Sequence, residues 1–124
     1  MNDAAILTET KARKFAKNWI EAWNSHDLDS ILSHYAAGVV LTSPVAAKLL
    51  NDPAGKVVGG KAVREYFQKG LELYPELSFE LLDLMWGISS VVLYYRNQVG
   101  TKSGEFMEFD SEGKVVRVVA HYSS

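Results

Sequence analysis

The chain has 124 residues, of which 48% are hydrophobic and 23% are charged, a composition that excludes a disordered, a collagen-like or a two-domain protein. We expect a single domain spanning residues 1–124, with its core from about residue 8 to 122. Thirteen basic and fifteen acidic residues give a net charge of -2, and no stretch concentrates Lys and Arg, so nucleic acid is not an expected partner.

Targeting and redox signals are scarce in this sequence. It contains no cysteine, which excludes disulfides, thiolate nucleophiles and cysteine-ligated metal centres. The segment from Met1 to Thr10 has neither a basic start nor a long apolar run, so we expect no signal peptide and no membrane association. A cytoplasmic location is the resulting expectation.

Two helices are predicted first along the chain. Apolar residues spaced three and four apart from Ala12 to Trp23 predict an amphipathic helix. Asp27 is then placed as the N-cap of a short second helix, which we expect Gly38 to end in the left-handed conformation.

A strand, an irregular stretch and a third helix are predicted next. The β-branched run from Val39 to Ser43, closed by Pro44, is typical of a strand. The stretch from Pro44 to Gly60 has the least regular pattern and is expected to form a lid. Helical spacing returns after Gly60 and stops at Pro75, which a helix interior cannot accommodate.

The remaining sequence alternates between apolar and polar residues. This period predicts an antiparallel meander whose strands contain Leu77–Leu81, Val91–Tyr95, Met107–Phe109 and Val116–Ala120. Because the helices precede most of the strands, the fold class is α+β rather than a parallel βαβ design.

Three stretches together carry a family resemblance: residues 22–29 (AWNSHDLD), 59–67 (GGKAVREYF) and 109–116 (FDSEGKVV). Their order resembles the nuclear transport factor 2-like superfamily, which includes SnoaL-like proteins, ketosteroid isomerases and polyketide cyclases. The resemblance implies a cone-shaped, strongly curved antiparallel sheet wrapped around N-terminal helices, as in the cystatin-like roll. It also implies an apolar pocket inside the cone and a homodimer built on the outer sheet face.

Of the three catalytic positions of the ketosteroid isomerase pattern, this chain has the matching type of residue at one. The pattern's oxyanion-hole tyrosine corresponds to Trp19, its catalytic base to Ser43, and its protonated oxyanion-hole acid to Glu105. A serine cannot act as the base at neutral pH unless another group activates it, so steroid isomerisation is not expected.

Two carboxylates are the candidate catalytic residues. Glu105 shares strand parity with Met107 and Phe109, so a pocket on that face would desolvate the carboxyl and raise its pKa. The alternative is that Glu105 reaches water beside the Gly104 turn. Asp83 interrupts an apolar strand face and is the second candidate, unless a bulge or the strand end turns it to solvent.

The candidate ligand-binding residues share apolar bodies or a hydroxyl expected inside the cone: Trp19, Tyr35, Leu41, Ser43, Tyr66, Met107, Phe109 and Val118. We expect the Trp19 indole N–H to donate to a ligand carbonyl. His26 and His34 lack metal-ligand spacing, and neither a metal nor a cofactor is expected. His121 has the parity of the outer sheet face, which leaves a place in the pocket or at a dimer interface open.

Three functions compete at this point. The first is a protein that binds a small apolar or aromatic ligand in the pocket. The second is an isomerase, cyclase or dehydratase that transfers a proton next to a carbonyl through Glu105 or Asp83. The third is an associative module with a filled cone.

A homodimer through the open sheet face is also predicted. Apolar residues are expected outside the pocket and would need cover, namely Val92, Tyr94, Val115 and Val119.

Overall fold

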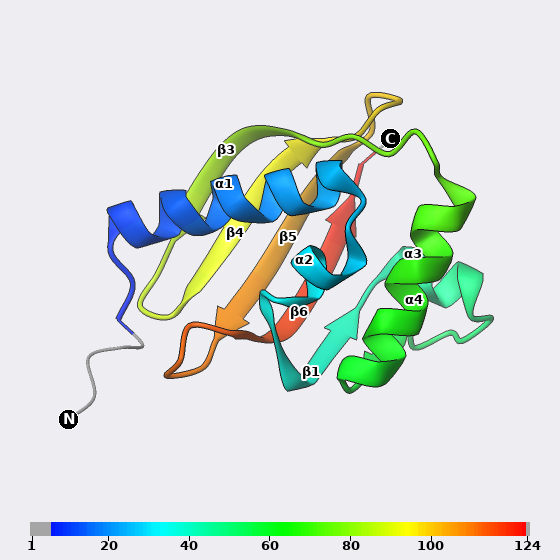
Figure 1. Cartoon of the computed structure of the whole chain (residues 1–124), viewed down its shortest axis with the longest axis horizontal. Coiled ribbons are helices and arrows are strands. Elements are labelled where there is room, and N and C mark those ends of the chain that lie inside the picture. The colour runs from blue at the N-terminus through cyan, green and yellow to red at the C-terminus, as the bar shows by residue number, and fades with distance from the viewer. Residues whose placement is uncertain (1–5, 124) are drawn as a thin grey trace.

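A computed structural model describes residues 6–123 and contains four helices and six strands (Figure 1). In chain order these are α1 Glu9–Ser25, α2 Leu28–Leu32, β1 Tyr35–Thr42, α3 Pro44–Leu49, β2 Lys56–Val58, α4 Gly60–Leu73, β3 Glu80–Trp86, β4 Ser90–Arg96, β5 Lys102–Phe109 and β6 Val115–Tyr122. The expectation about a signal peptide concerns Met1 to Thr10, whose first five residues lie outside the described part. Between residues 6 and 123 no helix is long and apolar enough to cross a bilayer.

The strands form one sheet in the order β2-β1-β6-β5-β4-β3, and the predicted α+β class is confirmed. The meander from β3 to β6 is antiparallel throughout. One pair departs from the expected antiparallel sheet, because β1 and β6 run parallel. These two strands are far apart in the chain and are joined through the whole meander rather than by a hairpin, and only hairpin neighbours are forced to be antiparallel.

The predicted helices are present, with different ends. Thr8 caps α1 by accepting from the Lys11 N–H, and Asp27 caps α2 as expected. The prediction that Gly38 ends α2 is wrong, because Ser33 is the C-cap and Gly38 already lies within β1. The left-handed residue near these helices is His26, with φ 60°, whose N–H donates to the Trp23 carbonyl at the end of α1.

The stretch from Pro44 to Gly60 is more regular than its sequence indicates, since it contains α3 and the edge strand β2. Ser43 caps α3 by accepting from the Val45 N–H, and Pro44 occupies the first helical turn. Gly55, at φ +60°, lies where the chain turns from α3 into β2 and passes close to Ser43. A Cβ at this position would lie 2.5 Å from the Ser43 carbonyl oxygen. A cap and a close backbone contact therefore order a segment that lacks a clear apolar period.

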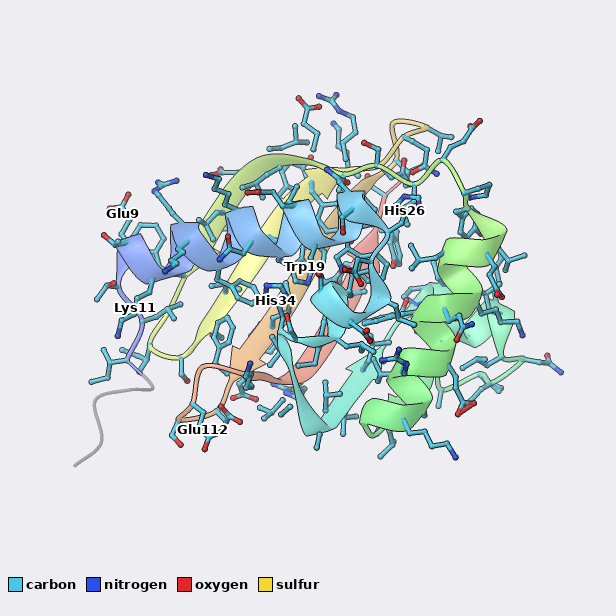
Figure 2. All side chains as sticks on the ribbon, in the orientation of Figure 1. Glu9, Lys11, Trp19, His26, His34 and Glu112 are labelled. Carbon is cyan, nitrogen blue, oxygen red and sulfur yellow. The ribbon has the colours of Figure 1, made fainter. Side chains whose placement is uncertain are left out.

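The core lies between the inner sheet face and α1. Figure 1 shows α1 crossing the sheet, and Figure 2 shows Trp19 pointing inward while Glu9 and Lys11 lie at the periphery. The apolar stripe of α1 comprises Ala12, Ala16, Trp19 and Trp23. It shares the core with strand residues of the inner face, among them Leu93, Met107 and Val118. The spacing of three and four predicted this stripe.

Two register shifts overturn expectations based on strict alternation. Between β3 and β4 the register shifts after Leu81, which leaves Asp83 exposed and turns Leu84 into the core. Between β5 and β6 it shifts after Glu108, so Val115 is fully buried. The placement of Val115 on the outer face was therefore wrong.

Candidate functional site

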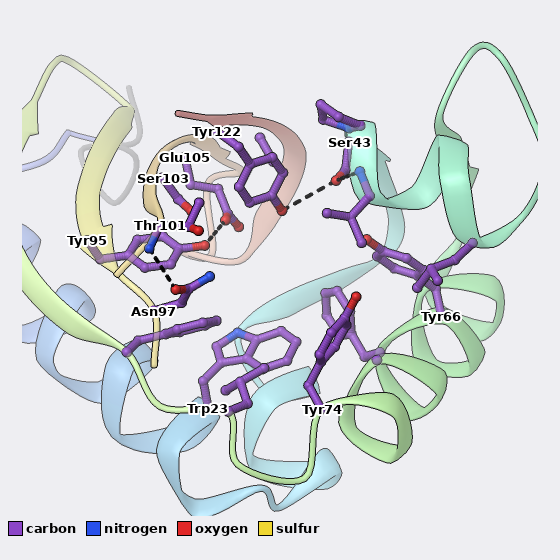
Figure 3. Close-up of a pocket in the computed structure, with 18 of the residues that line it drawn as sticks. Trp23, Ser43, Tyr66, Tyr74, Tyr95, Asn97, Thr101, Ser103, Glu105 and Tyr122 are labelled. Atoms are coloured by element: carbon purple, nitrogen blue, oxygen red, sulfur yellow. Dashed lines mark hydrogen bonds between the residues drawn. The ribbon is translucent and has the colours of Figure 1, made fainter. Parts of the chain in front are cut away.

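A cavity of about 550 Å³ opens between the sheet, the end of α1, α3 and α4 (Figure 3). Its lining residues are Trp19, Trp23, Leu41, Ser43, Pro44, Val45, Lys48, Leu49, Tyr66, Phe67, Gly70, Tyr74, Leu77, Phe79, Tyr95, Asn97, Gln98, Val99, Thr101, Ser103, Glu105, Ala120 and Tyr122. This volume lies in the range of small-molecule sites.

Strand register places the polar groups of the cavity. Ser103 pairs with Tyr95 on one side and Tyr122 on the other, forming a hydroxyl row across β4, β5 and β6. In the next inward-facing row, Glu105 lies between Leu93 and Ala120. The carboxyl is thus flanked across the sheet by apolar neighbours, while Tyr95 and Tyr122 lie diagonally from it and Ser103 precedes it on β5.

Glu105 is the buried carboxyl of this cavity. Its side chain is 7% exposed, and its Oε1 accepts a 2.6 Å hydrogen bond from the Tyr95 hydroxyl. Burial raises the pKa of Glu105 from 4.5 to about 7, while the Tyr95 hydrogen bond and the charge of His121 partly offset this rise. A carboxyl with that pKa exchanges a proton near neutral pH, as general acids and bases do.

Neutral phenols surround this acid. The Tyr122 hydroxyl lies 3.4 Å from Ser43 Oγ, and Tyr66 stands on the opposite wall (Figure 3). Burial raises the pKa of Tyr66, Tyr95 and Tyr122 above the usual 10. These groups therefore keep their protons near neutral pH and are available as hydrogen-bond partners.

Aromatic rings form the wall that faces the carboxyl. Trp19 stacks on Phe79 with ring centroids 5.8 Å apart, and Phe79 lies 4.6 Å from Tyr95. Trp23 meets Phe67 edge to face at 4.8 Å. Such surfaces favour contact with planar or apolar ligand groups.

The indole N–H of Trp19 is not free for a ligand. It donates a 2.9 Å hydrogen bond to the hydroxyl of Tyr35, which is itself buried behind the cavity wall. The expectation that this N–H meets a ligand carbonyl was therefore wrong, because a phenol on β1 occupies it. Within the described chain, Trp23 Nε1 is a buried nitrogen without a hydrogen-bond partner.

The motif at residues 22–29 fixes one side of the cavity. The Asn24 amide bonds both backbone groups of Phe79, accepting from its N–H at 2.7 Å and donating to its carbonyl at 3.0 Å. His26 Nε2 lies 2.7 Å from the Leu77 carbonyl. Asn24 and His26 thus hold the segment that supplies Leu77 and Phe79 to the cavity.

The structure brings some predicted site residues together and leaves others apart. Trp19, Leu41, Ser43, Tyr66 and Glu105 line the cavity. Four others are buried in the core without lining it: Tyr35, Met107, Phe109 and Val118. Asp83 lies outside, exposed, where its carboxylate accepts from the Leu84 N–H.

Several lining residues escaped the sequence reasoning, although strand parity could have indicated some of them. Tyr122 has the parity of Val118 and Ala120, and Ser103 has that of Glu105. His121 has the opposite parity and is exposed on the outer face, with Nδ1 3.1 Å from the Gly104 carbonyl oxygen. Among residues 6–123, no group of three or more His, Asp and Glu side chains is arranged to hold a metal ion.

A curved, unclosed sheet over helices with a cavity inside defines an α+β roll. The chain belongs to the SnoaL-like domain family, whose model matches residues 16–123. It is similar to a SnoaL-like protein of unknown function from Burkholderia thailandensis, at 37% identity over 96% of this chain and 99% of that one, with a TM-score of 0.92.

More distant structures share the fold. A protein of unknown function with a cystatin-like fold from Methylobium petroleophilum is 15% identical over 96% of this chain and 80% of that one, with a TM-score of 0.77. A candidate isomerase of the SnoaL-like family from Agrobacterium tumefaciens is 14% identical over 93% of this chain and 99% of that one, with a TM-score of 0.74. No curated protein matches the chain.

Proposed function

We propose that the chain binds a small apolar or aromatic molecule in the cavity, with no cofactor. The observation that carries this proposal is an open space of about 550 Å³ with aromatic walls and one buried carboxyl. A purely associative module would need only a cone filled by its own side chains, so the open cavity disfavours that function. Glu105 and Ser43 supply the polar contacts that orient the ligand.

A second candidate function is proton transfer next to a carbonyl, in an isomerase, cyclase or dehydratase. The pKa of about 7 at Glu105 favours it. A complete acid and base pair is not assembled among residues 6–123, however, because the hydrogen-bond partners of the Ser43 hydroxyl are the Val45 N–H and the Tyr122 phenol, and neither can take its proton near neutral pH. Asp83 has no part in this proposal, since it lies outside the cavity.

Binding is tested by NMR titration of the protein with 2-ethylnaphthalene and 2-acetylnaphthalene, two probes that differ by one ketone oxygen. We expect shifts of the Trp19 and Trp23 indole signals with both probes. Ala120→Phe, which fills the space beside Glu105, should weaken both, while Ala37→Phe on the exposed part of β1 should not. Absence of binding to the unaltered protein, or undiminished binding to a folded Ala120→Phe variant, contradicts the proposal.

Catalysis has a separate readout with the same ketone. A base acting next to the carbonyl would exchange the methyl protons of 2-acetylnaphthalene with solvent deuterium. If the second function holds, the unaltered protein accelerates this exchange and Glu105→Gln does not. Equal rates for both proteins would leave ligand binding as the function.

The proposal includes a homodimer built on the outer sheet face and a single cytoplasmic domain. The outer face carries an apolar row formed by cross-strand partners: Met85, Val92, Phe106 and Val119. Light scattering at micromolar concentration should give a dimer mass, and Phe106→Lys should give a monomer mass. A monomer mass for the unaltered protein refutes the dimer.

A further inference from the structure

The two carboxyl oxygens of Glu105 have different surroundings. Oε1 accepts the 2.6 Å hydrogen bond from the Tyr95 hydroxyl. Oε2 has no hydrogen-bond partner among residues 6–123. It is not fully enclosed by protein atoms, in contrast to the unpartnered Trp23 Nε1. Since Glu105 lines the cavity, Oε2 is the oxygen that opens toward a ligand.

Tyr95 is held as the donor in this pair. Its side chain is 3% exposed, and its cross-strand partner is Ser103. Burial and the Glu105 charge together raise the pKa of Tyr95 well above 10, and Ser103 offsets only part of this rise. The phenol therefore keeps its proton and directs it to Oε1.

We propose that Tyr95 is a positioning residue of this site: its donated proton occupies Oε1, so the acid proton of Glu105 resides on Oε2 and faces the ligand. This inference rests on the proposed function and names the ligand chemistry more closely. A protonated Oε2 offers a donor, so the ligand bears a hydrogen-bond acceptor, such as a carbonyl oxygen, on the edge that meets β5.

Other groups near Glu105 do not replace it as the titrating group of the cavity. Those that interact with its charge come from β1, α4, β4 and β6 and are Tyr35, Tyr66, Tyr95, Tyr122 and His121. The four phenols have pKa values raised by burial and stay neutral, and His121 acts from the outer sheet face. Glu105 is the cavity group whose pKa lies near 7.

The first test needs no ligand. Tyr95→Phe removes the donor that stabilises the ionised carboxylate, so the pKa of Glu105, followed by carboxyl-carbon NMR, should rise further. Tyr122→Phe is the matched control, since Tyr122 lines the same cavity without a hydrogen bond to Glu105; it should leave this pKa unchanged. An unchanged or lowered pKa in Tyr95→Phe overturns the proposal.

A second variant covers a failure of Tyr95→Phe to fold. Replacing Tyr95 with 3-fluorotyrosine keeps the ring and makes the phenol a stronger donor. The pKa of Glu105 should then fall, the opposite sign to the phenylalanine variant. An unchanged pKa would overturn the proposal as well.

The last test asks whether the positioned proton meets a ligand. At pH 5 the unaltered protein should prefer 2-acetylnaphthalene to 2-ethylnaphthalene. Tyr95→Phe should reduce this affinity ratio by up to about fivefold, the contribution of one net hydrogen bond, because the acid proton can then also reside on Oε1. A ratio unchanged in Tyr95→Phe refutes the positioning role. If neither probe binds, the proposed function fails, while the pKa tests still decide the role of Tyr95.

Discussion

Replacing Glu105 with glutamine isolates the energetic consequence of a buried acid. Gln keeps the shape of the side chain and an Oε1 acceptor for the Tyr95 hydroxyl, but it cannot ionise. The folded-state pKa of Glu105 is about 7, against 4.5 for the ordinary group. A proton is therefore bound more tightly in the folded protein than in the unfolded chain, and ionisation opposes folding.

The magnitude follows from the size of that difference. A separation of about 2.5 pKa units corresponds to about 3 kcal/mol of folding free energy. The contribution of Glu105 is present in full below pH 4.5. It is lost as the pH rises through about 7, and it stays lost above that value.

Urea unfolding of both proteins at several pH values measures this effect, because the other titrating groups cancel in the comparison. The two proteins should have equal stability near pH 4, and Glu105→Gln should be more stable by about 3 kcal/mol at pH 8. Glu105→Ala, which also removes packing and leaves Tyr95 without its acceptor, should be less stable than Gln by about 1–3 kcal/mol at each pH. A Gln variant that is less stable than the unaltered protein at pH 8 refutes the reasoning.

Three further substitutions test the surroundings of the cavity. Trp19→Phe should cost about 1–3 kcal/mol in urea unfolding, because it leaves the buried Tyr35 hydroxyl without its donor and removes part of a buried ring; the cost should be smaller in a Tyr35→Phe background, and an equal cost there would contradict the hydrogen-bond cause. Asn24→Ala should lower the free energy of unfolding by about 1 kcal/mol and speed amide exchange at Phe79, because it removes both hydrogen bonds to the Phe79 backbone. Asn18→Ala on the same helix should do neither. Slow exchange at Phe79 in Asn24→Ala would contradict the proposed role of these hydrogen bonds. Asp83→Asn should leave the affinity for 2-acetylnaphthalene unchanged, and a clear loss would return Asp83 to the site.

The sequence by itself determined the class of fold and several of the local elements. The spacing of apolar residues from Ala12 to Trp23 defines a helix with one buried face, and Asp27 caps the next helix with its own carboxylate. Strand parity put Glu105 on the same face as Met107 and Phe109, and it left open whether the carboxyl reaches water beside Gly104. Each of these features depends on residues close together in the chain, so a local period or a capping pattern reveals it.

Only the tertiary structure decided which polar groups meet. The pairing of Tyr95 with Glu105, and the capture of the Trp19 N–H by Tyr35, join side chains from different elements. The parallel contact of β1 with β6 and the exposure of Asp83 likewise follow from strand pairing and a register shift. Such features depend on how segments distant in sequence pack against one another, and no local period records that packing.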